Sequence, residues 1–172
     1  MAYDAYLWIE TITGEVTATF SEKPQGIAGP PIELFSFSWG ASNPSTVGSH
    51  STGLSSGKAS VSSFNIMKRS DNTSPLLFQM CVSGDHIPKA SVILRKATGK
   101  DSKQQVFLQY DFTDILVESV QWSGSSGGDE VPTESVSFAF AKVVVTNYVQ
   151  DTAKGGMKKG NMASWDLTKV EA

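Results

Sequence analysis

The chain has 172 residues, enough for one domain with its own core, and we expect a single domain over residues 1–172. Its 14 basic and 17 acidic residues give a net charge of −3, which argues against nucleic-acid binding, since that requires a concentrated basic face. No run of about 18 apolar residues occurs, so we expect no membrane insertion.

The N-terminus and the cysteine content indicate the compartment. Met1 to Asp4 shows no basic region followed by an apolar stretch, so we expect no Sec-type signal peptide. The chain is therefore predicted to fold in the cytoplasm, or to leave by a route that its N-terminus does not encode. The single Cys81 cannot form an internal disulfide, which fits a reducing compartment.

The first third of the chain predicts two strands separated by a loop. Met1 to Glu10 alternates between apolar and polar residues and is the first strand. Thr11 to Pro31 holds several glycines and prolines and is predicted to be a loop, with a short strand near Val16 to Phe20. Glu33 to Gly40 alternates strictly, so we expect an aromatic face and a small polar face on one strand. The aromatic face holds Phe35, Phe37 and Trp39, and the polar face holds Ser36 and Ser38.

The middle third predicts a long loop, a strand, a helix and a further strand. Ala41 to Gly57 is rich in Ser, Gly and Thr and is predicted to be a long protruding loop. Lys58 to Met67 is a strand, and Ala90 to Lys96 is another. Between them, Asp71 to Pro75 is typical of a helix start, with Thr73 or Ser74 as the cap, and Gly84 supplies the stop. Helical spacing is expected to place four residues against the sheet: Leu76, Leu77, Met80 and Cys81.

Two long alternating segments, Gln104 to Trp122 and Glu134 to Tyr148, predict one hairpin whose arms far exceed the usual strand length of about six residues. The alternation blurs around Asp114, as a bulge or bend produces. A Gly/Lys-rich link, Lys154 to Asn161, then leads to a short strand, Met162 to Leu167. The residues expected on one face of the first arm are Val106, Leu108, Tyr110 and Phe112; Val136, Phe138 and Phe140 form the large face of the second, Ser135, Ser137, Ala139 and Ala141 form its small face, and Trp165 is expected to anchor the last strand.

These elements predict a mainly β fold: a tight antiparallel β-barrel with one flanking α-helix and a long protruding loop. A barrel is favoured over a sandwich because long bent strands with one bulky and one small face close well, and closure removes exposed sheet edges.

Residues that could carry chemistry are sparse. His50 and His86 with one cysteine are too few for a typical metal site, so we expect no metal and no cofactor. A Ser-His-Asp arrangement using His86 is not excluded by counting, but no Gly-x-Ser-x-Gly elbow occurs. Asp129 and Glu130 resemble a calcium turn only faintly, and we expect them at a solvated hairpin tip or a rim contact between copies. The chain is therefore predicted not to be an enzyme.

An ordered series of segments resembles the haemolysin-coregulated protein family, Hcp, the inner-tube protein of the type VI secretion system. The series covers nearly the whole chain, and Phe37 stands where the family's aromatic motif has Trp. Its members are Met1 to Leu7, Phe35 to Gly40, Ser74 to Leu77 with Cys81, Ser83 and Gly84, Lys89 to Ala97, Ser123 to Glu130, Thr133 to Ala141, and Trp165 to Leu167 with Glu171-Ala172.

The resemblance implies a homohexameric ring of small β-barrels, stacked into a tube that is expelled with a spike protein and carries effectors in its lumen. Partners would be further copies of itself, the spike, the sheath and the effectors. The protein would be cytoplasmic and then secreted by the type VI system without a cleaved signal peptide. Three groups of residues follow: lumen contacts, Ser36 and Ser38; a ring-stacking loop, Ser45, Thr46, Val47, His50 and Leu54; and a ring-rim hairpin tip, Asp129 and Glu130.

Another class of protein also fits the pattern. A secreted monomeric ligand-binding β-barrel would show the same alternation, with its aromatic residues lining a pocket instead of filling a core. The tube hypothesis predicts a barrel with a packed core and an assembly of six copies. The ligand-binding hypothesis predicts a pocket inside the barrel and a monomer.

Overall fold

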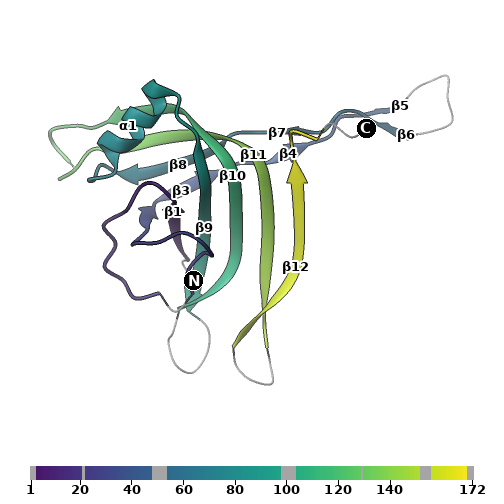
Figure 1. Ribbon diagram of the computed structural model, residues 1–172, viewed down its shortest axis with the longest axis horizontal. Helices are drawn as coiled ribbons and strands as arrows, with labels where there is room; N and C mark the ends of the chain where they lie inside the picture. Colours follow the sequence, from purple (N-terminus) through teal and green to yellow (C-terminus); the bar gives the residue numbers. More distant parts are fainter. Residues whose placement is uncertain are drawn as a thin grey trace.

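The computed structural model describes residues 3–20, 22–47, 54–97, 104–128, 130–151 and 156–169. In this part of the chain, strands predominate and a single helix flanks them, so the predicted fold class is confirmed (Figure 1). The elements are β1 (Asp4–Ile9), β2 (Ile32–Leu34), β3 (Ser36–Ser38), β4 (Ala41–Ser42), β5 (Ser45–Val47), β6 (Leu54–Ser56), β7 (Ser60–Val61), β8 (Phe64–Arg69), α1 (Ser74–Ser83), β9 (Ile87–Ala97), β10 (Gln104–Ser123), β11 (Thr133–Gln150) and β12 (Met157–Asp166).

One eight-stranded antiparallel sheet curls into a nearly closed barrel. Its strand order is β2-β1-β9-β10-β11-β8-β3, and β12 pairs with β11 outside this path. The two ends of the order meet because β3 follows β2 after the single residue Phe35, whose N–H donates to the carbonyl oxygen of Met67 at 2.8 Å. Closure joins the β2 and β3 ends of this order, as the barrel hypothesis required, and leaves the second side of β12 open.

The long hairpin β10–β11 confirms the central prediction, and its bend divides the barrel. Asp114 has a φ of 54°, a left-handed conformation that a non-glycine residue rarely adopts, and the register slips between Val117 and Ser119. Up to Ile115, β10 pairs with β9, and the later part of β10 lies beside α1 instead. On β11, residues 133–138 pair with β8 and residues 142–150 pair with β12. Each long strand therefore serves two sheet directions.

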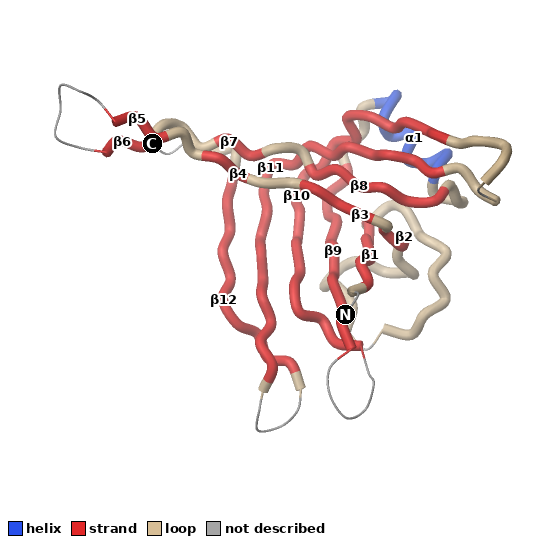
Figure 2. Tube along the Cα trace, turned by 180° about the vertical axis from the view of Figure 1, so that it is seen from behind, coloured by secondary structure: helices blue, strands red, loops and turns tan. Residues whose placement is uncertain are grey.

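The segment predicted as a loop, Ala41 to Gly57, is instead a two-stage β-hairpin in its described part. β4 pairs with β7 and β5 pairs with β6, and the N–H of Gly57 donates to the carbonyl oxygen of Pro44 at 2.7 Å between the two stages. We call β4 to β7 the arm. It protrudes from the barrel on the side opposite the β10–β11 turn, as both ribbon views show (Figures 1 and 2).

Two predicted strands are split. Glu33 to Gly40 breaks at Phe35, so β2 pairs with β1 while β3 pairs with β8. Phe37 and Trp39 pack on the core as predicted, but Phe35 is 50% exposed and lies under the guanidinium of Arg69, 5.0 Å from its ring centre. Lys58 to Met67 is likewise divided into β7 and β8. At Phe35 the chain passes from β2 to β3, which pair with different strands. Between β7 and β8 it passes from the arm into the barrel wall. Alternation of apolar and polar residues reveals neither change of partner.

Val106 does not share a face with Leu108 and Tyr110, contrary to the prediction. Between Val106 and Leu108 the register with β9 slips by one residue, and a slip of one reverses the faces. Val106 therefore joins an outer cluster that contains Tyr6, Trp8, Ile27 and Ile93.

That outer cluster is covered by the segment after β1. The ring of Phe20 in this segment meets the rings of Tyr6 and Trp8 edge to face, and the guanidinium of Arg95 lies 4.3 Å from the Phe20 ring centre. No strand forms at Val16 to Phe20, so that prediction was wrong; the aromatic contacts hold this segment without a ladder. Gly14 is needed there because a Cβ would stand 2.0 Å from the carbonyl oxygen of Pro31.

The last strand is longer than predicted and begins at Met157 instead of Met162. Its first half, which contains Lys158, Lys159 and Gly160, has no apolar alternation to reveal it. Trp165 was expected to anchor this strand in the core, but it is 49% exposed. Trp165 pairs with Val143 and therefore shares the face of the sheet that points into the barrel. It is nevertheless exposed, because the earlier part of β11 bends away from β12 and pairs with β8 instead.

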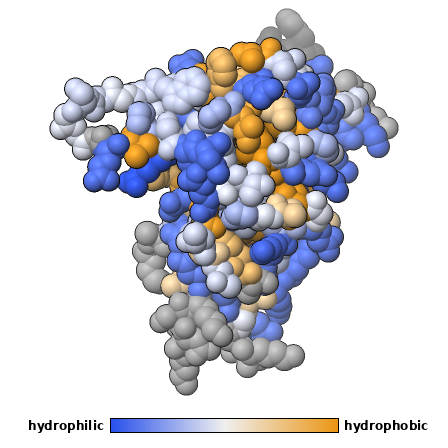
Figure 3. Space-filling model, turned by 60° about the vertical axis from the view of Figure 1, so that its left-hand side comes forward, coloured by the Kyte–Doolittle hydropathy of each residue, from blue (hydrophilic) through white to orange (hydrophobic). Residues whose placement is uncertain are grey.

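Helix α1 starts and stops close to the predicted positions. Gly84 ends it in a left-handed conformation, φ 71°, and its N–H donates to Met80 O. Thr73 occupies the N-cap position but its side chain does not cap the helix; the Asp71 carboxylate accepts from the Thr73 N–H at 2.8 Å instead. Leu77 is fully buried, whereas Leu76 is exposed, contrary to the prediction. Figure 3 brings this side forward and shows apolar side chains gathered over its upper half.

A buried ion pair ties α1 to the barrel. Lys68 on β8 and Glu134 on β11 are register partners and fully buried, with Nζ and Oε1 2.5 Å apart. The same Nζ lies 2.8 Å from Asp71 Oδ1 and 3.3 Å from Ser74 Oγ at the start of α1. One ammonium group therefore joins two strands and the helix.

The longest described helix is α1 itself, and its ten residues are too few to cross a bilayer.

Candidate assembly surface

The two serines predicted to contact the lumen lie on a polar sheet face that the strand pairing assembles. Ser36 pairs with Met67, which in turn pairs with Ser135; Ser38 pairs with Asn65. Direct partners in an antiparallel sheet share a face. The face, which we call the serine face, consists of Ser36 and Ser38 on β3, Asn65 and Met67 on β8, and Ser135, Ser137 and Ala139 on β11.

The opposite face of the same strands is core. Phe37 pairs with Ile66 and Ile66 pairs with Val136, and these three side chains belong to the main apolar cluster. The predicted division of the second hairpin arm into a large and a small face is therefore confirmed on β11. On the serine face, Ser137 Oγ donates to Glu118 Oε2 at 3.1 Å, and Met67, which is 45% exposed, is the one large apolar side chain among the hydroxyl and amide groups.

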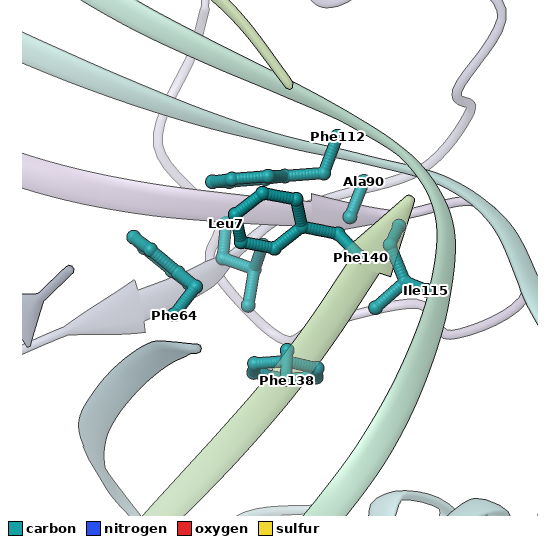
Figure 4. Close-up of a pocket in the computed structure, with 7 residues that line it drawn as sticks. All are labelled: Leu7, Phe64, Ala90, Phe112, Ile115, Phe138 and Phe140. Carbon is teal, nitrogen blue, oxygen red and sulfur yellow. The ribbon is translucent and has the colours of Figure 1, made fainter. Parts of the chain in front are cut away.

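The barrel interior is filled. A cavity of about 10 Å³ remains, at the lower limit for one water molecule. Its lining side chains point toward one another, and the rings of Phe112 and Phe140 lie with centres 4.8 Å apart (Figure 4). Small-molecule sites usually have volumes of about 300–1,000 Å³. The interior therefore offers no room for a ligand, which counts against the ligand-binding alternative. The lining consists of Leu7, Phe64, Ala90, Phe112, Ile115, Phe138 and Phe140.

One tyrosine at the edge of this core titrates late. Burial raises the pKa of Tyr110 above its usual 10.0; a hydrogen bond with Trp39 opposes this rise, and the nearby phenol of Tyr3 adds to it. The rings of Tyr110 and Trp39 meet edge to face at 5.3 Å. Tyr110 therefore acts as a packed core ring with a shielded hydroxyl.

His86 does not meet a serine in the described part of the chain. Its Nδ1 lies 2.5 Å from Asp114 Oδ1 at the bend of β10, and both side chains are more than half exposed. The preceding Asp85 instead accepts a hydrogen bond from Ser83 at 2.7 Å. The Ser-His-Asp hypothesis thus finds a His-Asp pair without a nucleophile. Nor do the described residues bring together three side chains that could hold a metal.

The predicted stacking residues fall on the outer stage of the arm. Ser45, Thr46 and Val47 form β5, and Leu54 begins β6, with Val47 and Leu54 as register partners. His50 lies outside the described residues. The expected loop is therefore a hairpin at these positions.

The predicted rim residues are divided between the described and undescribed parts. Asp129 lies outside the described residues, and Glu130 lines a surface groove of about 280 Å³. A second groove of about 430 Å³ adjoins it, and the two share Phe35, Arg69 and Val131. We call the pair the tip groove. The sequence did not predict this groove, because its residues come from distant segments. One continuous strand over Glu33 to Gly40 would also place Phe35 on the core face, so the exposure of its ring was not predicted.

The nearly closed antiparallel sheet, its filled interior and the protruding arm define a small β-barrel protein. Comparisons with known proteins then specify the class. Residues 6–147 match the family model described as type VI secretion system effector, Hcp, and the chain belongs to this family.

Relatives agree over most of the fold. The chain is similar to Hcp1 of Pseudomonas aeruginosa, with 38% identity over 101 residues, which are 58% of this chain and 60% of that protein, so the match spans less than two thirds of the relative. A solved structure of a type six secretion system protein is 31% identical with a TM-score of 0.83, covering 97% of both chains. Hcp1 from Salmonella typhimurium is 33% identical with a TM-score of 0.72, covering 98% of this chain and 97% of that one.

Proposed function

We propose that this chain is the structural subunit of a type VI inner tube: six copies close into a ring, rings stack, and effectors travel in the lumen. The observation that carries the proposal is the serine face, a sheet surface of mostly small and polar side chains around the exposed Met67, backed by a filled core. Membership of the Hcp family supports the type VI context.

The serine face suits a channel wall. Ser36 and Ser38 are exposed, and their short side chains keep a lumen wide while their hydroxyls can bond to varied cargo. Cargo that differs in shape is better served by adaptable hydroxyl and amide groups than by a fixed cluster of charges. We therefore place Ser36 and Ser38 toward the lumen.

The arm suits contact between stacked rings. It protrudes well clear of the barrel (Figure 1), and its outer stage contains Ser45 to Val47 paired with Leu54 to Ser56. A hairpin of this kind cannot bury its own sides, so a second copy would supply the missing surface. The β10–β11 turn with Asp129 and Glu130 would form the rim of the ring.

The remaining parts of the proposal concern partners and chemistry. The spike, the sheath and the effectors would be the tube's partners. The chain would act without catalysis and without a cofactor, and His86 with Asp114 would be an exposed structural pair at the bend. The protein would assemble in the cytoplasm and leave through the secretion machine.

Electron microscopy and native mass spectrometry of the purified protein test the proposal. We expect sixfold rings with an open centre and a mass six times 18.4 kDa. A stable species of 18.4 kDa at all concentrations would instead support the monomeric ligand-binding alternative. A His86→Ala variant should assemble and carry cargo as the parent does; loss of a measurable hydrolytic activity in that variant would contradict the non-catalytic role.

A further inference from the structure

The strand β12 leaves one edge of the sheet open. It pairs with β11 along one side, and no other described strand pairs along its second side. An unpaired edge of ten residues is a template for association, and monomeric proteins usually protect such an edge. Here it carries two large apolar side chains instead: Met162, 58% exposed, and Trp165, 49% exposed. We call this edge the β12 margin.

The two apolar side chains flank the open edge from opposite faces. Trp165 pairs with Val143 and so takes the face of the barrel core, while Met162 pairs with Thr146 on the other face. The indole ring of Trp165 and the thioether of Met162 can therefore contact both faces of a partner that lies alongside this edge.

The tip groove lies where the barrel closes, at the junction of β2 with β8, away from the β12 margin. In Figure 2, β2 and β12 lie on opposite sides of the barrel. The groove includes Glu33 of β2 and two exposed apolar residues, Phe35 and Val131. The β12 margin thus projects apolar groups, and the tip groove offers a hollow.

The charges of the β12 margin and of the tip groove are complementary. The tip groove is lined by the carboxylates of Glu15, Glu33, Asp71 and Glu130 against one guanidinium, Arg69. Asp71 is held by buried Lys68, but none of the other three carboxylates forms an ion pair with a described residue. The β12 side carries the opposite net sign, with four lysines against Asp151 and Asp166: Lys142, Lys158, Lys159 and Lys169.

We propose that these two surfaces bind each other: the β12 margin of one copy docks in the tip groove of the next. A cyclic ring of identical subunits needs two different, mutually complementary surfaces on each copy, because its contacts run head to tail. Both surfaces are present on this chain, and they face away from each other. The occupant of the tip groove is therefore a second copy of the chain. The proposal rests on the ring proposed above and names the contact that closes it.

Two single variants and their mixture test this contact. Trp165→Glu spoils the β12 margin, and Val131→Lys spoils the tip groove by facing the lysines of the partner copy with a like charge; each site is already partly exposed, so neither variant should unfold the barrel. Each variant alone should lose the six-copy mass in native mass spectrometry. An equal mixture should give a species of two copies, one of each variant, because one intact margin still meets one intact groove.

Controls separate this contact from other effects. Val82→Glu changes an exposed apolar side chain on α1, outside both surfaces, and should leave rings intact. Circular dichroism checks that each variant is folded, and Met162→Glu replaces Trp165→Glu if the latter fails this check.

The outcomes are distinct. Rings in the parent and also in Trp165→Glu or Val131→Lys would overturn this contact while leaving the tube proposal standing. A mixture that yields only single copies, or full rings, would overturn the pairing of the two surfaces, as would loss of rings in Val82→Glu. A parent that never assembles would overturn the tube proposal, and this contact with it.

Discussion

Removing the ammonium group of Lys68 should be among the most damaging single changes to the barrel. In a Lys68→Met variant, the Glu134 carboxylate would be left buried without a partner. No other donor in the described part of the chain reaches either of its oxygens. Breaking one side of a buried pair costs about 3–5 kcal/mol. Asp71 would also lose its contact at the start of α1. Since whole domains have free energies of unfolding of about 5–15 kcal/mol, this is a large share of the total.

The converse change should cost less. In Glu134→Leu, Lys68 keeps Asp71 Oδ1 at 2.8 Å and the Arg69 carbonyl at 2.8 Å, so its charge remains partly compensated. The double variant Lys68→Met/Glu134→Leu leaves no buried charge at this position. Apolar replacements of buried pairs are often neutral or stabilising, so the double variant should recover most of the loss caused by Lys68→Met.

Urea unfolding of the four proteins at one fixed concentration measures these differences, because assembly would otherwise shift the apparent stability. The coupling free energy from this cycle should exceed about 2 kcal/mol, within the range for residues in contact. If the double variant is destabilised by the sum of the two single effects, the pair contributes nothing as a pair and the reasoning is wrong.

Four further predictions concern packing, ionisation and the proposed tube. Gly14→Ala should lower the free energy of unfolding by about 1–3 kcal/mol through its backbone clash, whereas an alanine at the open tip position Gly127 should leave the midpoint in urea unchanged. Burial raises the pKa of Tyr110, so the stability that its neutral phenol contributes is present below pH 10 and is lost as the pH rises through the raised pKa. A pH titration of tyrosinate absorbance should therefore show one late step fewer in Tyr110→Phe than in the parent. The pKa of Tyr148 is also raised by burial, so its own late step should remain in that variant. Ser38→Gln should leave rings intact but reduce cargo recovered in pull-downs, and undiminished recovery would contradict the lumen assignment. Deleting residues 45–55 should spare single rings and impair tubes, and normal tubes by electron microscopy would refute a stacking role.

Alternation alone predicted the barrel wall well. The β10–β11 hairpin, its bend near Asp114 and the two faces of β11 follow from side chains whose period matches a strand. Glycine also marked the helix end, since Gly84 adopts the left-handed conformation that other residues avoid.

Features that depend on tertiary context were not predictable in the same way. The break at Phe35 leaves the local alternation unchanged, so only the two different strand partners reveal it. The first half of β12 has two lysines and a glycine and is a strand because β11 offers it a partner. A one-residue slip beside Val106 reversed its face without any signal in composition.

The buried ion pair did leave a signal in the sequence. Lys68 continues the inward phase of Phe64 and Ile66, and Glu134 precedes Val136 in the inward phase of its own strand. Opposite charges at inward positions of two strands indicate partners, because an unpaired buried charge is too costly. This rule would have predicted both the pairing of β8 with β11 and its register.

The filled interior has a mechanical consequence. Close-packed protein cores are nearly incompressible and pass strain on to their surroundings. A barrel whose interior, lined by described residues, holds a void of about 10 Å³ would behave under axial load as a stiff body. In the proposed tube, almost all elastic deformation would then occur at the contacts between copies. The stiffness of such a tube would be set by the contacts of the margins and arms, and not by the walls of its subunits.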